Sequence, residues 1–219
     1  MNSYFAHEID LVNKFIDIKF KTSSRSITTT EVPIRWGNID IVNIKNNYIP
    51  FNNEQCKILS KASNSRIFLK TKKNRGISKK SLLSEKGMSE KTIQNCINQL
   101  IKTKLIIKKD CLFYRNIDFT FPKVIITGYE AKLTDYNKAF FQAMINKEYV
   151  DYSYMVFPMD IANKILKKYQ NVLIEHGIGL IGVSHNEQKR LIKAHKVSNI
   201  KQYIRLANLI QTNLKASVY

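Results

Sequence analysis

An acidic residue stands two positions before a lysine at Glu130-Ala131-Lys132, at the end of an apolar run. If the run 124–129 is a strand, Glu130 and Lys132 point to the same face, because strand side chains alternate. A second carboxylate, Asp40, lies inside the apolar stretch 37–42, where it is costly unless it is paired or binds a cation. Two adjacent strands could bring both carboxylates to one edge, which would form an oxygen site suited to Mg²⁺. The pattern predicts metal-assisted hydrolysis of a phosphate ester, with Lys132 orienting the attacking water or helping to deprotonate it.

The same acid-x-Lys spacing occurs at 17–19 and at 187–189, so the spacing alone selects nothing. The first copy is expected just beyond an amphipathic helix, and the second is expected to open another helix. Residues two apart in a helix point in different directions, so only Glu130 and Lys132 are predicted to share a face. One alternative stays open, in which Asp40 and Glu130 are surface carboxylates and one forms a salt bridge with Lys132.

The elements that must position these residues follow from the apolar periodicity. Helices are predicted at 4–15, 136–147 and 160–169, and strands at 31–35, 38–44, 124–132, 152–157 and 178–183. A polar run rich in Ser and Thr, 22–30, precedes the first strand, and one or two basic amphipathic helices are expected at 186–216. This order predicts an α/β fold in which helices flank a mixed sheet.

The middle of the chain reads as a separate unit. An Asn-rich linker precedes it and Pro122 follows it. Ser78 and Ser89 are predicted to cap two helices, the second at 90–102, and a strand, turn and strand follow at 105–114. The domain prediction is therefore a discontinuous core of residues 1–47 and 122–219, with residues 48–121 inserted.

This inserted unit resembles the winged helix-turn-helix of bacterial DNA-binding regulators. The resemblance implies that the helix 90–102 enters the major groove of double-stranded DNA. Its outward side chains would approach the bases, and lysines nearby would contact phosphates. The predicted DNA-binding residues are Lys79, Lys80, Lys91, Gln94, Asn95, Asn98, Lys108 and Lys109. The alternative is a module that docks a protein partner.

The distribution of charge supports a nucleic-acid partner. The formal net charge is +19 and the pI is about 9.8. Residues 54–125 contain 17 Lys or Arg against 5 Asp or Glu, a surplus of 12 in about a third of the chain. Such clustering favours phosphate binding over a lysine-rich surface that only reflects AT-rich coding.

Outside the insert, the order of helix, strands and the Glu130-Ala131-Lys132 motif resembles the PD-(D/E)XK nuclease superfamily, which has a restriction-endonuclease-like fold. The resemblance implies a metal-dependent DNA endonuclease that leaves 5′-phosphate and 3′-hydroxyl ends. Asp40, Glu130 and the carbonyl of Ala131 would bind Mg²⁺, with Mn²⁺ as a substitute. Lys132 would be catalytic, Glu8 would support the site from the first helix, and Gln142 would lie near it.

Hydropathy and cysteine content narrow the expected cellular location of the protein. No apolar run approaches the roughly 20 residues of a membrane helix, so no membrane is expected and a cytoplasmic protein is predicted. Three cysteines without CxxC spacing indicate free thiols. A restriction or other defence nuclease is one setting, and a homodimer would be needed to cut both strands at once. The rivals are a non-catalytic DNA-binding regulator and a partner-docking subunit on a nuclease-like scaffold.

Overall fold

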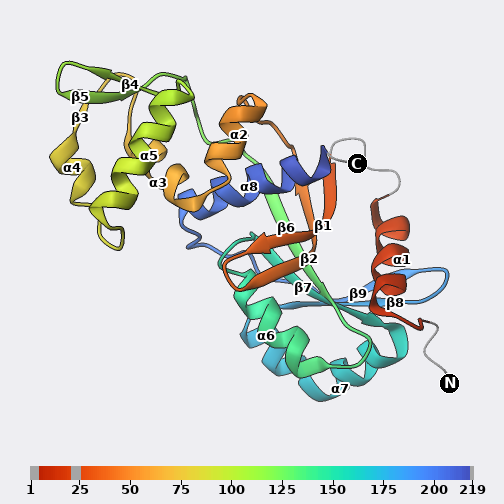
Figure 1. Cartoon of the computed structure of the whole chain (residues 1–219). Coiled ribbons are helices and arrows are strands. Elements are labelled where there is room, and N and C mark those ends of the chain that lie inside the picture. The colour runs from red at the N-terminus through yellow and green to blue at the C-terminus, as the bar shows by residue number, and fades with distance from the viewer. Residues whose placement is uncertain (1–4, 21–25, 218–219) are drawn as a thin grey trace. The chain divides into compact units, whose positions relative to one another are not determined.

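The computed structural model describes residues 5–20 and 26–217, and the chain divides into two compact units. Unit 1 comprises the described residues of Met1–Asn47 and Lys123–Ile200. Unit 2 comprises those of Tyr48–Pro122 and Lys201–Val218. Figure 1 labels the helices and strands of both units.

Unit 1 is built on one sheet, to which six strands of the described chain contribute in the order β1-β2-β6-β7-β8-β9. The pairs β6/β7 and β7/β8 are parallel and the other neighbours are antiparallel, so the sheet is mixed. The predicted class, an α/β fold with a mixed sheet flanked by helices, is confirmed. The strands are β1 (Ser26–Ile34), β2 (Gly37–Lys45), β6 (Ile125–Ala131), β7 (Tyr152–Pro158), β8 (Gly179–Val183) and β9 (Gln188–Ile192).

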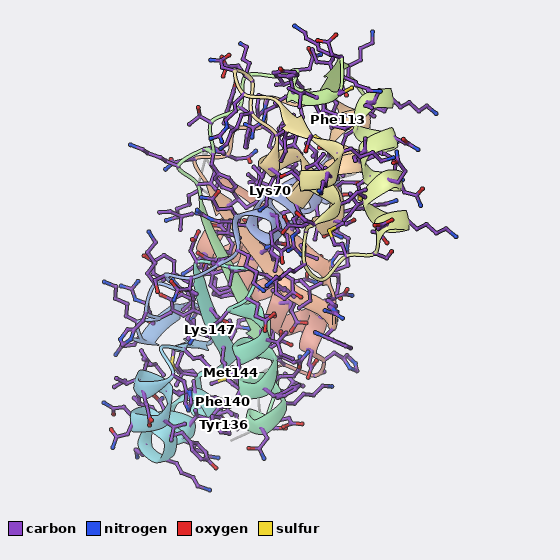
Figure 2. All side chains as sticks on the ribbon, turned by 90° about the vertical axis from the view of Figure 1, so that its left-hand side faces the viewer. Lys70, Phe113, Tyr136, Phe140, Met144 and Lys147 are labelled. Atoms are coloured by element: carbon purple, nitrogen blue, oxygen red, sulfur yellow. The ribbon has the colours of Figure 1, made fainter. Side chains whose placement is uncertain are left out.

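Helices cover both faces of this sheet. On one face, α1 (Glu8–Phe20) buries Leu11 and Phe15 against Tyr129 and other strand residues. On the other face, α6 (Tyr136–Asn146) and α7 (Met159–Glu175) pack against a cluster that includes Phe157. Figure 2 shows the labelled side chains Tyr136, Phe140 and Met144 following one another along α6, with Lys147 just past its end. The ring of Tyr136 stacks on Tyr169 of α7 with centroids 4.0 Å apart, which ties the two helices together.

Two strands of unit 1 differ from the sequence prediction. Strand β1 begins at Ser26, inside the Ser- and Thr-rich run, whose residues 22–25 lie outside the described chain. Its threonines are β-branched and pair with β2, which favours the extended conformation. Strand β9 lies where a helix was predicted, because pairing with β8 decided the conformation of this short segment.

Unit 2 combines helices with a small sheet of order β3-β5-β4. Its helices share one apolar core with Phe113 of the sheet. Ser78 and Ser89 cap α4 and α5 as predicted, with each hydroxyl accepting a first-turn amide. On α5, Ile101 is 38% exposed, whereas Ile93, Ile97 and Leu100 are buried. The elements are α2 (Asn53–Leu59), α3 (Ala62–Lys70), β3 (Ile77–Ser78), α4 (Lys79–Leu83), α5 (Glu90–Lys102), β4 (Ile106–Lys109), β5 (Leu112–Arg115) and α8 (Gln202–Ala216).

The C-terminal helix α8 corrects the domain prediction, which placed residues 122–219 together in the core. Leu206 and Ile210 of α8 are buried in the apolar core of unit 2, together with Leu59 and Phe68. The amphipathic pattern shows that this helix has an apolar face, but it does not show which core that face covers. None of the helices in the described part of the chain is long and apolar enough to span a membrane.

Candidate active site

Strands β2 and β6 bring the two predicted carboxylates to one edge of the sheet. The ladder between these strands ends at the pair Ile41 and Tyr129, and Asp40 and Glu130 are the next residues along each strand. Instead of a further backbone pair, the amide of Ala131 donates to Asp40 Oδ2 at 2.9 Å. Asp40 is therefore fixed against the strand that carries Glu130.

The ammonium of Lys132 lies among these groups. Its Nζ donates to Ala131 O at 2.9 Å, to Glu130 Oε1 at 3.0 Å and to Asp40 Oδ2 at 3.2 Å. Glu8 Oε2, at the start of α1, is 3.5 Å from the same Nζ. Four of the predicted site residues and the carbonyl of Ala131 thus meet at one point. We call Glu8, Asp40, Glu130, Ala131 and Lys132 the acid–lysine cluster.

Burial distinguishes this cluster from surface ion pairs. The side chain of Lys132 is 5% exposed and that of Glu130 is fully buried, whereas Glu8 is half exposed. Burial and the charge of Asp40 raise the pKa of Glu130 well above its ordinary value, and Lys132 offsets only part of this. Burial alone would lower the pKa of Lys132, but Asp40 and Glu130 outweigh it, so the net pKa is raised and the amine stays protonated.

Helix α6 adds a residue that the sequence analysis missed. Asn146 is buried and its Nδ2 donates to Glu130 Oε2 at 3.3 Å, which holds the second oxygen of this carboxylate. Gln142 lies one helical turn earlier on the same side of α6. Its Oε1 is buried and has no hydrogen-bond partner among the described residues. The spacing of four from Gln142 was the signal that could have identified Asn146.

The other two acid-x-Lys triplets form no such cluster. Asp17 is exposed within α1, which extends further than predicted. Glu187 and Lys189 are also exposed, although the segment beside them is a strand and not the predicted helix. The expected helical context was therefore wrong for 187–189, and burial separates this triplet from 130–132 where secondary structure does not.

The oxygen atoms of the cluster fit a hard cation such as Mg²⁺. Asp40, Glu130 and Ala131 O already surround one cation, Lys132 Nζ, at 2.9–3.2 Å. Carboxylate and carbonyl oxygens are the ligands that Mg²⁺ prefers. Within residues 5–20 and 26–217, no group of three or more His, Cys, Asp or Glu side chains is arranged to hold a metal ion. The predicted ligand set needs only two such side chains, because its third ligand is a backbone carbonyl.

The predicted DNA-binding residues all lie in unit 2. All are exposed except Gln94, which is half-buried on α5. Gln94 Nε2 donates to Asn98 Oδ1 at 2.9 Å, so this amide pair is joined along the helix. Asn95 is exposed beside it, and Lys108 and Lys109 lie on β4.

Comparisons with known proteins identified no similar protein. No protein-family model matches the sequence, and no match was found among curated proteins or solved structures.

Proposed function

We propose that this chain is an Mg²⁺-dependent DNA endonuclease of the PD-(D/E)XK type, with unit 2 as a winged helix that guides DNA binding. The observation that carries the proposal is the buried meeting point of Asp40, Glu130 and Ala131 O around Lys132 Nζ. A buried carboxyl such as Glu130, whose pKa is strongly raised and which has a specific charged partner, is more common at functional sites than elsewhere. A restriction or defence role is one biological setting for this activity.

In this proposal each residue of unit 1 has a separate role. Bound by Asp40, Glu130 and Ala131 O, Mg²⁺ would neutralise charge on the phosphate and make a coordinated water more acidic. The ammonium of Lys132 would donate to the attacking water or to a phosphate oxygen, where negative charge develops. Glu8, which is half exposed, would hold Lys132 from the solvent side. The unpaired Oε1 of Gln142 could accept a hydrogen bond from a water molecule.

Unit 2 would supply affinity. The helix α5 would approach base edges with Asn95 and with the Gln94–Asn98 pair. The hairpin of β4 and β5 would act as the wing, and Lys108 and Lys109 would contact phosphates. These lysines are exposed, so they can reach a duplex without rearrangement of the fold.

A second candidate, a non-catalytic DNA-binding regulator, is favoured by one observation. Lys132 already donates to every oxygen that the proposal assigns to Mg²⁺. Such a cluster can be a self-sufficient structural ion network, and buried networks of this kind also occur without catalysis. Unit 2 would then be the functional part, and unit 1 a scaffold.

Cleavage of supercoiled plasmid DNA tests the two candidates. The endonuclease is expected to give nicked or linear product with Mg²⁺ or Mn²⁺ and none with EDTA, and Asp40→Asn should give none with either ion. Asp17→Asn is the matched control, because it changes an exposed acid of another acid-x-Lys triplet in unit 1. Linear product without prior nicking would indicate two cooperating copies. DNA binding without any cleavage by the unaltered protein would favour the regulator, and cleavage by Asp40→Asn would refute the assigned site.

A further inference from the structure

Unit 1 has a second polar site, a cavity of about 450 Å³. Four cationic side chains line it, namely Lys19, Lys45, Arg190 and Lys193. Three tyrosines, Tyr129, Tyr152 and Tyr154, line it together with Gln188. No Asp or Glu of the described chain is among its lining residues. We call this cavity the basic pocket.

The basic pocket lies away from the acid–lysine cluster. Lys45 is five residues from Asp40 along β2, a distance of about 17 Å at 3.4 Å per residue. Tyr129 packs on the face covered by α1, whereas its neighbour Glu130 contacts α6 on the other face. Helix α1 reaches both sites, with Glu8 at its first residue and Lys19 near its last. The pocket is therefore a separate site on the face of the sheet that α1 covers, opposite the face on which Glu130 contacts α6.

The positive charge of the basic pocket is not neutralised within the described part of the chain. None of its four cations forms an ion pair there. The Nζ of Lys19 lies 5.5–5.9 Å from the ring centres of Phe15, Phe20 and Tyr129. Burial, followed by the charges of Arg190 and Lys45, lowers the pKa of Lys19. Like charges gathered around a cavity without counter-charges favour an anionic ligand.

The inner surface of the pocket suits an aromatic group. The rings of Tyr129 and Tyr154 are stacked with centroids 5.6 Å apart, and both are nearly buried. Tyr152, two residues before Tyr154 on β7, is only partly buried. The Oε1 of Gln188 is buried without a hydrogen-bond partner among the described residues, so it can accept from a ligand N–H. A base offers both a π face for tyrosine and N–H groups for this oxygen.

We propose that the basic pocket binds a nucleotide, with its phosphates at the cations, its base against the tyrosines and an N–H of the base on Gln188. This goes beyond the endonuclease activity, because the pocket lies on the other face of the sheet from Glu130. The nucleotide has two sources with the same chemistry, a free nucleoside phosphate or one nucleotide of a single strand. Both carry the phosphate and the base that the lining can recognise.

Binding titrations of the full chain in EDTA test the proposal independently of cleavage. The probes are dATP, inorganic triphosphate and a single-stranded tetranucleotide. The double variant Lys45→Gln/Arg190→Gln should weaken binding of the nucleotide probes roughly tenfold or more, since it removes two phosphate contacts. Lys167→Gln/Lys168→Gln, on α7, removes the same charge from exposed positions that do not line the pocket. This control should bind within about twofold of the unaltered protein, and thermal melting checks that all variants are folded.

The outcomes distinguish a free nucleotide from a nucleotide of a single strand, and both from failure of the proposal. Tighter binding of dATP than of inorganic triphosphate, lost in Tyr152→Leu, supports recognition of the base. Saturation by dATP indicates a free nucleotide. Binding of the tetranucleotide alone, with a salt slope that falls by about 0.7 per lost contact, indicates a strand. Equal affinity for dATP and inorganic triphosphate would overturn the nucleotide proposal, as would binding that is unchanged by Lys45→Gln/Arg190→Gln.

Discussion

The two units hold their charges in opposite ways. In the acid–lysine cluster of unit 1, acids and one lysine compensate one another within 3.5 Å, and the central groups are buried. In unit 2, the predicted DNA-binding lysines are exposed, and none forms an ion pair in the described part of the chain. Buried charges are costly and need defined partners, whereas exposed cations remain available to phosphates. Single substitutions should therefore change DNA cleavage and DNA affinity separately.

The largest effect is expected in the acid–lysine cluster. Lys132→Ala and Asp40→Ala should lower Mg²⁺-dependent plasmid cleavage by at least about a hundredfold, because each removes a group that the proposed mechanism places at the reacting phosphate. DNA affinity should change by only a few fold, since the proposal assigns most phosphate contacts to unit 2. Cleavage rates and gel-shift affinities on the same DNA measure both. Lys189→Ala, in an exposed triplet of the same unit, should leave both unchanged. Equal losses of cleavage and affinity would contradict the division of roles.

The acid–lysine cluster also predicts that Mg²⁺ can restore the stability that is lost when Lys132 is removed. Lys132→Ala leaves Glu130 buried without its cation, which should lower the free energy of unfolding by about 3 kcal/mol in EDTA. Added Mg²⁺ should raise the melting temperature of Lys132→Ala more than that of the unaltered protein, because it would supply the missing charge. Asp40→Asn/Lys132→Ala, which also lacks a proposed ligand, should show less of this rescue. Thermal melts over a range of Mg²⁺ concentrations measure it, and equal shifts in all three proteins would argue against a metal among these oxygens.

Helix α8 allows the independence of the units to be tested. Removing 48–122 together with 201–219 should leave a unit 1 that melts cooperatively, because Lys45 and Ile125 are paired and a short linker can join the cut ends. Removing only 48–121 should give an aggregating protein. This deletion removes the apolar residues that bury Leu206 and Ile210, and burial of each of these side chains is worth about 1.5–3 kcal/mol. Size-exclusion profiles and melting curves distinguish the two deletions. A monomeric, cooperatively melting product of the second deletion would show that α8 does not depend on residues 48–121.

The sequence correctly predicted the elements whose conformation depends on their own residues. The caps at Ser78 and Ser89 and the pairing of strand and motif at Glu130 depend on local chemistry, and the structure has them where they were expected. The conformation of β9 depends on its pairing with β8, and the position of α8 depends on the core against which it packs. The local sequence pattern specifies neither of these contacts. Within the site, Asn146 was missed because its spacing of four from Gln142 is its only sequence signal, and that spacing does not show that the Asn is buried.

In unit 2, two substitutions should separate base contacts from phosphate contacts. Asn95→Ala should cost about 1–3 kcal/mol at a preferred site and little elsewhere, because an amide can pair bidentately with adenine. Lys108→Ala should weaken binding to every duplex and reduce the salt slope by about one counterion. Titrations on selected and random duplexes at several salt concentrations measure these effects. If both variants bind every duplex like the unaltered protein, unit 2 is better explained as a protein-docking module.

The smallest expected effect is on stability, at Glu85 of unit 2. Like Asp40 and Glu130 of the acid–lysine cluster, this residue pairs with cations while largely shielded from solvent. Glu85 is 14% exposed and contacts Arg66 and Lys70, the latter at 2.9 Å. Burial alone would raise the pKa of Glu85, but hydrogen bonds from Lys70 and Arg66 outweigh it and lower the pKa below the ordinary 4.5. Its contribution to stability is therefore present above pH 4.5 and is lost as the pH falls through the lower folded-state pKa.

Glu85→Gln should accordingly cost about 1 kcal/mol at pH 7, and the difference from the unaltered protein should shrink as the pH falls through the lowered pKa of Glu85. Asp118→Asn is the matched control, because Asp118 pairs with Lys73 at 3.1 Å but is 83% exposed, so solvent screens the pair. Urea unfolding between pH 3 and pH 7 measures both variants. An Asp118→Asn effect as large as that of Glu85→Gln would show that burial is not what gives an ion pair its strength here, and it would weaken the distinction drawn between the two units.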